Sequence, residues 1–370
     1  MSQPTSDAIY AERLLRAQKE LQARNLDVLL VGPGSDLFYL LGFNAHLSER
    51  LNLLIIPKTG KPSYIAPVLE ALLVASKSDL VAIHAWAETE SASDLVASVL
   101  AAQPGTTLAV GDQLWSVFLL RLQSAIPGGK WTSSNDVMRA LRMSKDAYEI
   151  ERLTEVSRLT DEAWGEFIEG GPISGLTEKQ TMARLADLTK AKGLGEVWGI
   201  CASGPNAASP HHHTGDRVLQ QGDSVIFDWG GILDGYHSDI TRTVFIGAPS
   251  DEQRKVYDIV MRANQAAFDA VKPGVPCEDL DKAARAVITD AGYGPAFLHR
   301  VGHGLGLDVH EEPYLVGGNA MPLAAGMCFS DEPGIYLEGN FGVRIEDAVI
   351  CTDTGAKRLN EASRAITVMD

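Results

Sequence analysis

The sequence predicts two domains, an α/β domain followed by an α+β domain. Helical and strand-like apolar patterns alternate in the first part of the chain, which is typical of an α/β domain. The second part has pairs of capped helices followed by hairpins dense in glycine and proline, which is typical of an α+β domain. A length of 370 residues also favours two domains. We place the boundary so that the domains are residues 1–143 and 144–370.

The apolar periodicity of domain 1–143 predicts its elements in order. A Gly-rich loop, residues 32–36, leads into an apolar segment, residues 37–42. The domain contains neither a P-loop nor a strand-borne GxGxxG motif, so no nucleotide site is predicted. Helices are expected at 11–24, 69–76, 92–101 and 116–125, and strands at 28–31, 53–56, 63–65, 81–83 and 108–110.

Domain 144–370 is predicted to hold two pairs of helices packed on a curved antiparallel sheet. Hydroxyl residues that can cap a helix precede three of these helices, and two of them have a glutamine three positions on, which makes a capping box. The expected helices run from the cap Ser144 to Gly170, from Thr177 with Gln180 to residue 192, from Ser250 with Gln253 to Val271, and from 278 to 291.

Composition and charge indicate a soluble cytoplasmic protein. The formal net charge of −16 disfavours nucleic acid or an anionic membrane as a partner, and most of the acids are expected on a solvated surface. The four cysteines form no CxxC pair, which argues against a disulfide framework and a zinc ribbon and fits a reducing compartment. The polar start of the chain shows no signal sequence, and no apolar run is long enough to span a membrane.

One predicted hairpin, residues 225–243, carries two acids where apolar residues are expected. Acids are depleted in strands, yet Asp228 and Asp239 lie in the two arms. If the turn is centred between Leu233 and Asp234, the two carboxylates lie directly opposite on one face, where like charges repel. A metal cation, or a pair of cations, would neutralise them.

Three further segments place ligand-type residues in glycine-rich or strand contexts. They contribute His303 between glycines, Glu332 before a Pro-Gly turn, and Glu346 on a strand. Each residue alone is more often a solvated acid or a packed histidine, with a chance of roughly one in ten of a functional role. Together, four carboxylates and one imidazole suit Mn²⁺, Co²⁺, Fe²⁺ or Zn²⁺, and two divalent ions would balance four negative charges.

These five residues, in this order and in these local motifs, resemble the metal-binding set of the pita-bread metallopeptidases, which include methionine aminopeptidases, aminopeptidases P and prolidases. The resemblance covers SGPNAASPH, DWGG, SDITRT, HRVGHGLGLDVHE, DEPGIY and VRIED. Residues 39–43 and 49–50 are similar to the creatinase/prolidase-like accessory domain of the Xaa-Pro branch. The resemblance therefore implies an accessory α/β domain before a pita-bread catalytic domain, two metal ions with Mn²⁺ favoured, and a homodimer.

The resemblance also implies a role for each site residue. Asp228 is expected to hold one metal ion, His303 and Glu332 the other, and Asp239 and Glu346 both. His211 would assist proton transfer or contact the scissile amide, His310 would stabilise the oxyanion, and Glu332 would pass a proton to the leaving amine. Arg344 is expected near the substrate, and His299 and Tyr236 beside the site, with packing as the alternative for these two.

The expected reaction is hydrolysis of Xaa-Pro dipeptides by a metal-bridging hydroxide. The alternative is an aminopeptidase P acting on longer peptides. A non-catalytic binding module and a metal-free amidinohydrolase resembling creatinase are disfavoured because all five ligands are present. We hypothesise that one subunit lends Asp36, and Arg50 with it, to the pocket of its partner, where Asp36 binds the substrate ammonium and Arg50 or Arg344 its carboxylate. The alternative role of Asp36 is to cap the helix that begins at Leu37.

Overall fold

The computed structural model describes residues 7–370, which form two compact units. The first unit ends at Arg142 and the second begins at Met143. Each unit has its own apolar core. Among residues 7–370, no helix is long and apolar enough to cross a membrane.

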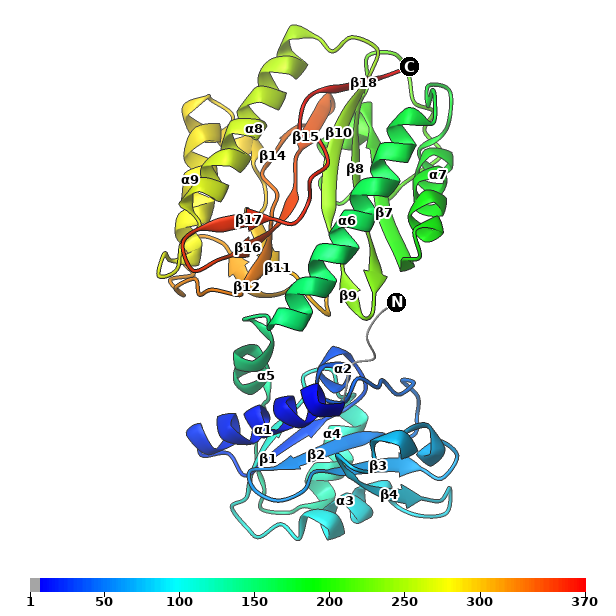
Figure 1. Cartoon of the computed structure of the whole chain (residues 1–370), viewed down its shortest axis with the longest axis vertical. Helices are drawn as coiled ribbons and strands as arrows, with labels where there is room; N and C mark the ends of the chain where they lie inside the picture. The colour runs from blue at the N-terminus through cyan, green and yellow to red at the C-terminus, as the bar shows by residue number, and fades with distance from the viewer. Residues whose placement is uncertain (1–6) are drawn as a thin grey trace. The chain divides into compact units, whose positions relative to one another are not determined.

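The first unit is a mixed six-stranded sheet covered by helices (Figure 1). The strand order is β4-β3-β2-β1-β5-β6, with β1 antiparallel to β2 and parallel to β5. Helices α1, α2 and α5 pack together, and α3 packs on α4. The elements are α1 (Asp7–Ala23), β1 (Val28–Val31), α2 (Ser35–Leu41), β2 (Leu53–Pro57), β3 (Ser63–Pro67), η1 (Ala71–Leu73), η2 (Ala75–Lys77), β4 (Ala82–Trp86), α3 (Ala92–Leu100), β5 (Thr107–Val110), α4 (Ser116–Ala125), β6 (Lys130–Ser133) and α5 (Asn135–Arg142).

The expected helix at 69–76 is wrong, and the segment forms the two short 3₁₀ turns η1 and η2 instead. Its apolar side chains do not form a buried stripe, since Leu69, Leu72 and Leu73 are between 63% and 85% exposed. Most of the stability of a short helix comes from an apolar face packed on the core, and this segment has none. Strand β6 and helix α5 were not predicted.

The second unit contains two five-stranded sheets and a separate hairpin (Figure 1). One sheet has the order β18-β10-β8-β7 with β9 beside β8, and the other has the order β12-β11-β13-β16-β17. The elements are α6 (Ala147–Glu169), α7 (Glu178–Ala191), β7 (Gly195–Ser203), η3 (Gly204–Ala208), β8 (Ser224–Leu233), β9 (Tyr236–His237), β10 (Ile240–Ile246), α8 (Asp251–Ala270), α9 (Cys277–Asp290), η4 (Gly294–Ala296), β11 (Gly302–Gly304), β12 (Glu311–Leu315), β13 (Cys328–Asp331), β14 (Gly334–Leu337), β15 (Phe341–Arg344), β16 (Asp347–Cys351), β17 (Ala356–Arg358) and β18 (Thr367–Met369).

We expected a curved antiparallel sheet, and the strands of the second unit are divided between two sheets and a hairpin. They are interrupted where acids occur, because Asp239 falls between β9 and β10, Glu332 between β13 and β14, and Glu346 between β15 and β16. An isolated bridge between Thr241 and Glu346 links the two sheets at this point. The breaks in the strands thus coincide with the acids that the sequence singled out.

Capping boxes open three of the long helices. Those of α7 and α8 are confirmed, with Thr177 and Ser250 as the caps. The cap of α6 is Asp146, not Ser144 as predicted, because Asp146 and Glu149 exchange side-chain-to-backbone hydrogen bonds of 2.9 and 3.0 Å. Ser144 lies instead in a bridge to Met327.

The register of the hairpin formed by β8 and β10 also differs from the prediction. Leu233 pairs with Tyr236, so the turn consists of Asp234 and Gly235, both with positive φ. An Asp-Gly pair with positive φ at both positions matches a type I′ hairpin turn. Asp228 consequently lies opposite Thr241 and not opposite Asp239. The two acids still share one face, as diagonal neighbours.

An aromatic cluster supports the other face of β8. Trp164 of α6 lies 5.0 Å from Trp229 and 5.5 Å from Phe227, measured between ring centroids. All three side chains are buried. Because side chains alternate along a strand, Asp228, between Phe227 and Trp229, points away from α6.

Candidate metal centre and active site

A pocket of about 650 Å³ in the second unit collects most of the residues that the sequence singled out. Its wall contains all five expected metal ligands together with three of the expected histidines and Arg344. The lining residues are Trp198, Ile200, Pro210, His211, Asp228, Asp239, His299, Arg300, His303, Val309, His310, Val316, Glu332, Arg344 and Glu346.

The two acids of the β8–β10 hairpin each have a carboxylate oxygen without a hydrogen-bond partner in the part of the chain that the structure describes. These atoms are Oδ1 of Asp228 and Oδ1 of Asp239, and both are buried. Burial raises the pKa of Asp239 well above its usual value, and the neighbouring Asp228 and Glu332 raise it further. A buried carboxylate without a donor is costly, so these oxygens mark a place for a cation.

Glu346 is held on the opposite side by the hairpin itself. Its Oε2 accepts a hydrogen bond of 2.6 Å from the Thr241 hydroxyl. Burial raises the pKa of Glu346 well above its usual value, and Asp239 adds to the rise. One ligand atom from each of Asp239, His303 and Glu346 lies within 4.8 Å of the others.

His303 is oriented by the groups around it. Its Nε2 lies 3.2 Å from Oε1 of Glu332 and 3.6 Å from Oδ2 of Asp239, and its Nδ1 lies 3.1 Å from its neighbour's carbonyl oxygen, that of Gly304. A backbone acceptor at one ring nitrogen that leaves the other to face acids is the usual arrangement of a metal-binding histidine. Gly302 is required next to it, because a Cβ there would lie 1.9 Å from the carbonyl oxygen of Ser330.

The pocket acids titrate as a group because they are buried together. Burial raises the pKa of Glu332, but the hydrogen bond to His303 and the nearby positive charges bring it down to about 2. Four carboxylates and one imidazole with unpartnered oxygens are a donor set that suits divalent metal ions. The residues present therefore fit a metal centre.

Arg344 is a hub within this site. Its guanidinium is buried and donates to oxygens of four residues, two of which, Asp228 and Pro210, line the pocket. The contacts are Nη2 to Oδ2 of Asp228 at 2.6 Å, Nη1 to the Tyr336 hydroxyl at 2.9 Å and to the Pro210 carbonyl at 3.4 Å, and Nε to the Thr241 hydroxyl at 3.1 Å. Arg344 thus neutralises Asp228 and is committed to protein partners.

The histidines of the pocket lie in different settings. The His310 ring packs edge-on against His303 with centroids 4.1 Å apart, and burial, with His303 and Arg300 nearby, lowers the pKa of His310 to about 4. Nε2 of His299 is 2.8 Å from the Tyr336 hydroxyl, and burial lowers the pKa of His299. His211 is exposed and lies on the loop before β8.

Comparison with known proteins gives this site a family. Residues 151–353 match the metallopeptidase family M24, and residues 13–144 match the creatinase/prolidase N-terminal domain. The chain belongs to metallopeptidase family M24. It is 41% identical to a probable dipeptidase PepE of Mycobacterium tuberculosis, over 98% of this chain and 97% of that protein. An Xaa-Pro dipeptidase of Lactobacillus helveticus is 33% identical, over 96% of this chain and 98% of that protein.

The fold of this M24 metallopeptidase agrees with the same comparison. The crystal structure of dipeptidase PepE from Mycobacterium ulcerans superposes with a TM-score of 0.94 at 41% identity, covering 99% of each chain. The predicted fold class is confirmed: a creatinase/prolidase N-terminal domain is followed by a pita-bread catalytic domain. Membership of the family implies divalent metal ions, which the acid-rich pocket fits.

Three of the predicted site residues of the metallopeptidase do not line this pocket. Tyr236 is buried and donates a hydrogen bond of 3.2 Å to Glu149, so the packing role is the one its contacts support. Asp36 and Arg50 belong to the first unit. Asp36 accepts a hydrogen bond of 2.7 Å from Arg142, and Arg50 donates one of 2.6 Å to Glu88. The capping role of Asp36 is wrong, because α2 begins at Ser35.

Sequence reasoning missed several residues that the structure places in or behind the pocket. Trp198, Ile200 and Val316 form an apolar part of the wall, and Arg300 adds a cation. Arg300 is the second residue of the HRVGHGLGLDVHE motif around His303, so its position in the sequence was a usable signal. Glu178, which anchors the loop carrying His211, gave no signal because it reads as an ordinary acid in the first turn of a helix.

Proposed function

We propose that this metallopeptidase is a dipeptidase that hydrolyses Xaa-Pro dipeptides and uses two divalent metal ions, Mn²⁺ foremost. One observation carries the proposal: five ligand-type side chains converge in one pocket, and two of their buried carboxylate oxygens have no partner among the described residues. The similarity to the Lactobacillus helveticus Xaa-Pro dipeptidase supports the choice of substrate.

In this proposal Asp228, Asp239, His303, Glu332 and Glu346 would hold the two metal ions. Two ions match the four carboxylates in charge, and the buried Arg344 offsets part of the negative charge around Asp228. The bound ions would supply Lewis-acid polarisation of the scissile carbonyl and a water of lowered pKa.

The remaining steps fall to side chains of the pocket. Glu332 takes a proton from the attacking water and passes it to the leaving proline nitrogen, which must be protonated as the C–N bond breaks. His310 donates a hydrogen bond to the developing oxyanion, and His211 contacts the scissile amide. His299 acts on the site through the Tyr336 hydroxyl, which itself bonds to Arg344.

The charged ends of a dipeptide require charged partners in the enzyme. Arg344 is committed to Asp228 and Tyr336, so it is a poorer candidate for the substrate carboxylate than we expected. Arg300 lines the pocket, and its guanidinium lies 4.4 Å from the centre of the Tyr314 ring. Among the described residues it has no acidic partner. We therefore assign the carboxylate to Arg300.

The experiment is a hydrolysis assay of metal-free protein reconstituted with Mn²⁺, Co²⁺ or Zn²⁺. The substrates are Leu-Pro, Ala-Pro, Leu-Gly and Leu-Pro-Gly, and chelator-treated enzyme is the control. Cleavage of Leu-Pro and Ala-Pro alone is expected. Cleavage of Leu-Gly as well would indicate a broader dipeptidase, cleavage of Leu-Pro-Gly an aminopeptidase P, and no cleavage with any metal a binding module.

A contribution of Asp36 from a partner subunit remains our hypothesis for the ammonium of the substrate, with Arg50 on the same domain and a homodimer as its condition. Asp36→Asn is expected to lower the turnover of Leu-Pro. The matched control is Arg142→Met, which breaks the same ion pair but keeps the carboxylate. Equal effects of the two variants on turnover and melting temperature would show that only the ion pair matters.

A further inference from the structure

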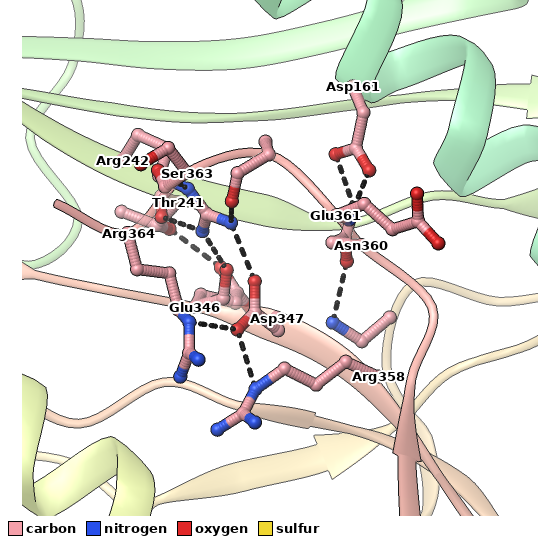
Figure 2. A network of polar contacts seen from close by, with 12 residues as sticks. Asp161, Thr241, Arg242, Glu346, Asp347, Arg358, Asn360, Glu361, Ser363 and Arg364 are labelled. Atoms are coloured by element: carbon pink, nitrogen blue, oxygen red, sulfur yellow. Dashed lines mark hydrogen bonds and ion pairs between the residues drawn. The ribbon is translucent and has the colours of Figure 1, made fainter.

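Arg242 of β10 is buried next to Glu346, one of the expected metal ligands (Figure 2). Only 2% of its surface is exposed. Each of its hydrogen bonds goes to an oxygen of the protein. These are Nη1 to the carbonyls of Thr241 at 2.9 Å and Glu346 at 2.6 Å, Nη2 to Oδ1 of Asp347 at 2.7 Å and to the Ala362 carbonyl at 2.7 Å, and Nε to the Ser363 carbonyl at 3.1 Å.

Asp347 is the acidic partner of Arg242, and two further arginines approach it. Its side chain is 1% exposed, and its second oxygen accepts a hydrogen bond of 3.1 Å from Nε of Arg358. Nε of Arg364 lies 3.6 Å from the same oxygen. Figure 2 shows the carboxylate of Asp347 between these groups. Such a fully paired carboxylate holds its strand in one position.

The link to the metal centre runs through the backbone and side chain of Glu346. Its carbonyl accepts from Arg242, its N–H donates to the Thr241 carbonyl at 3.1 Å, and its carboxylate accepts from the Thr241 hydroxyl. The N–H, the carbonyl and the carboxylate of Glu346 are thus held by two consecutive residues of β10, Thr241 and Arg242. The carboxylate of Asp347, the next residue along the chain, accepts a hydrogen bond from Arg242 and so holds the guanidinium in place.

If Arg242 served only to stabilise the fold, fewer contacts would be enough. The contacts of Arg242 with Ala362 and Ser363 already tie β10 to the segment before β18. The Nη1 contact with Glu346 adds nothing to that connection, but it sets the direction in which the Glu346 carboxylate enters the pocket. Partners of this kind behind a metal ligand typically change metal affinity by about 10- to 100-fold.

We propose that Arg242 and Asp347 are positioning residues that hold Glu346 ready for metal binding and thereby set the metal affinity of the pocket. This inference rests on the proposed metal centre. It assigns a function to a buried ion pair that touches neither the substrate nor the ions themselves.

The test is calorimetric titration of metal-free protein with Mn²⁺, together with the visible absorption spectrum of the Co²⁺-loaded form. Asp347→Asn keeps the shape of the side chain but weakens its hold on Arg242, and it is expected to weaken Mn²⁺ binding by about 10- to 100-fold and to alter the Co²⁺ spectrum. Arg242→Lys, which cannot reach the same set of acceptors, is expected to do the same.

The matched control is Arg358→Lys, which removes a partner of Asp347 but no contact with Glu346. Its Mn²⁺ affinity is expected to change by less than about tenfold. The melting temperature of each metal-free variant separates a loss of stability from a loss of affinity.

Each outcome bears on a different statement. Unchanged Mn²⁺ affinity and an unchanged Co²⁺ spectrum in Asp347→Asn and Arg242→Lys would overturn the positioning role, even if both variants melt earlier. Equal weakening in the Arg358→Lys control would also overturn it, because the effect would then follow the arginine cluster as a whole. Failure of the unmodified protein to bind Mn²⁺, Co²⁺ or Zn²⁺ would overturn the metal centre itself.

Discussion

Two buried acids of the catalytic domain, Glu178 and Asp239, have opposite surroundings. Both side chains are nearly inaccessible, at 0% and 3% exposure of the residue. Asp239 has one oxygen without a partner and one 3.6 Å from His303. Glu178 accepts five hydrogen bonds, from N and Oγ of Ser203, Nδ2 of Asn206, Nε2 of His212 and N of Gly215.

The pKa values follow from this difference. Burial raises the pKa of both acids. For Glu178 the hydrogen bonds outweigh burial and lower the pKa below its usual value, whereas the neighbours of Asp239 are acids and raise it further. Within the described residues, both carboxylate oxygens of Glu178 (the structural acid) have hydrogen-bond donors, whereas one oxygen of Asp239 (the pocket acid) has none. A buried carboxylate oxygen without a hydrogen-bond donor thus distinguishes an acid that is available to bind a ligand from an acid that stabilises the fold.

The largest expected effect comes from changing the pocket acid. Asp239→Asn should weaken Mn²⁺ binding by more than about 100-fold, because a direct ligand counts for more than the groups behind it, and activity should fall with it. The metal-free protein should melt at the same temperature or higher, since a repelling charge is removed. Titration calorimetry measures the Mn²⁺ affinity, and thermal unfolding measures the stability of the metal-free protein. A large loss of stability in the metal-free variant would show that Asp239 stabilises the fold, as Glu178 does, and would contradict the contrast between the two acids.

Changing Glu178 should lower the stability of the protein but not its affinity for Mn²⁺, the opposite of changing Asp239. Glu178→Ala leaves buried donors without an acceptor and should lower the free energy of unfolding by roughly 3 kcal/mol, measured by urea denaturation of the metal-free protein. Mn²⁺ affinity should change little. Asp187→Ala on the same helix is the control, because the side chain of Asp187 is 79% exposed. An equal stability for both variants would refute the assignment.

Arg300 extends the comparison to a cation that has no acidic partner within residues 7–370. Arg300→Met should raise KM for Leu-Pro by about 10- to 100-fold, the value of a charged hydrogen bond, and leave kcat nearly unchanged. Met keeps an unbranched apolar stem but lacks the guanidinium that lies over the Tyr314 ring. Steady-state kinetics with Leu-Pro and with its C-terminal amide provide the measurement. If KM rises equally for both substrates, Arg300 does not bind the carboxylate.

The smallest expected effect is a pH dependence of stability. The folded-state pKa of Glu178 lies below its ordinary value of 4.5, so its ionised form stabilises the fold fully above pH 4.5. This contribution is lost as the pH falls through the lower, folded-state pKa. The difference in unfolding free energy between the unmodified protein and Glu178→Gln should therefore shrink below pH 4.5. A difference that stays constant from pH 7 to pH 3 would contradict this prediction.

The sequence predicted the residues that line the pocket more fully than the strand register and the long-range contacts that hold the fold around them. Local motifs indicated all five residues that we propose as metal ligands, and the structure brings them to one pocket. Each residue alone is ordinary, but the set of five in one domain is unusual. The register of the hairpin was misjudged although the Asp234–Gly235 pair is a strong turn signal. The pairing of Asp36 with Arg142, 106 positions away, could not be predicted, since no local pattern encodes it. The same holds for the hydrogen bonds of Glu178.

Arg344 connects to Asp228 across 116 positions, and Thr241 connects to Glu346 across 105. Closing loops of this length is slow, and contacts between distant positions are typically made late in folding. The hairpin with Asp228 and Asp239 can form earlier, because its arms are joined by a two-residue turn. During folding, a chain with a finished hairpin therefore carries two acids but no histidine or Glu346 beside them. Tight capture of metal is thereby restricted to molecules whose catalytic domain has completed its long-range closure.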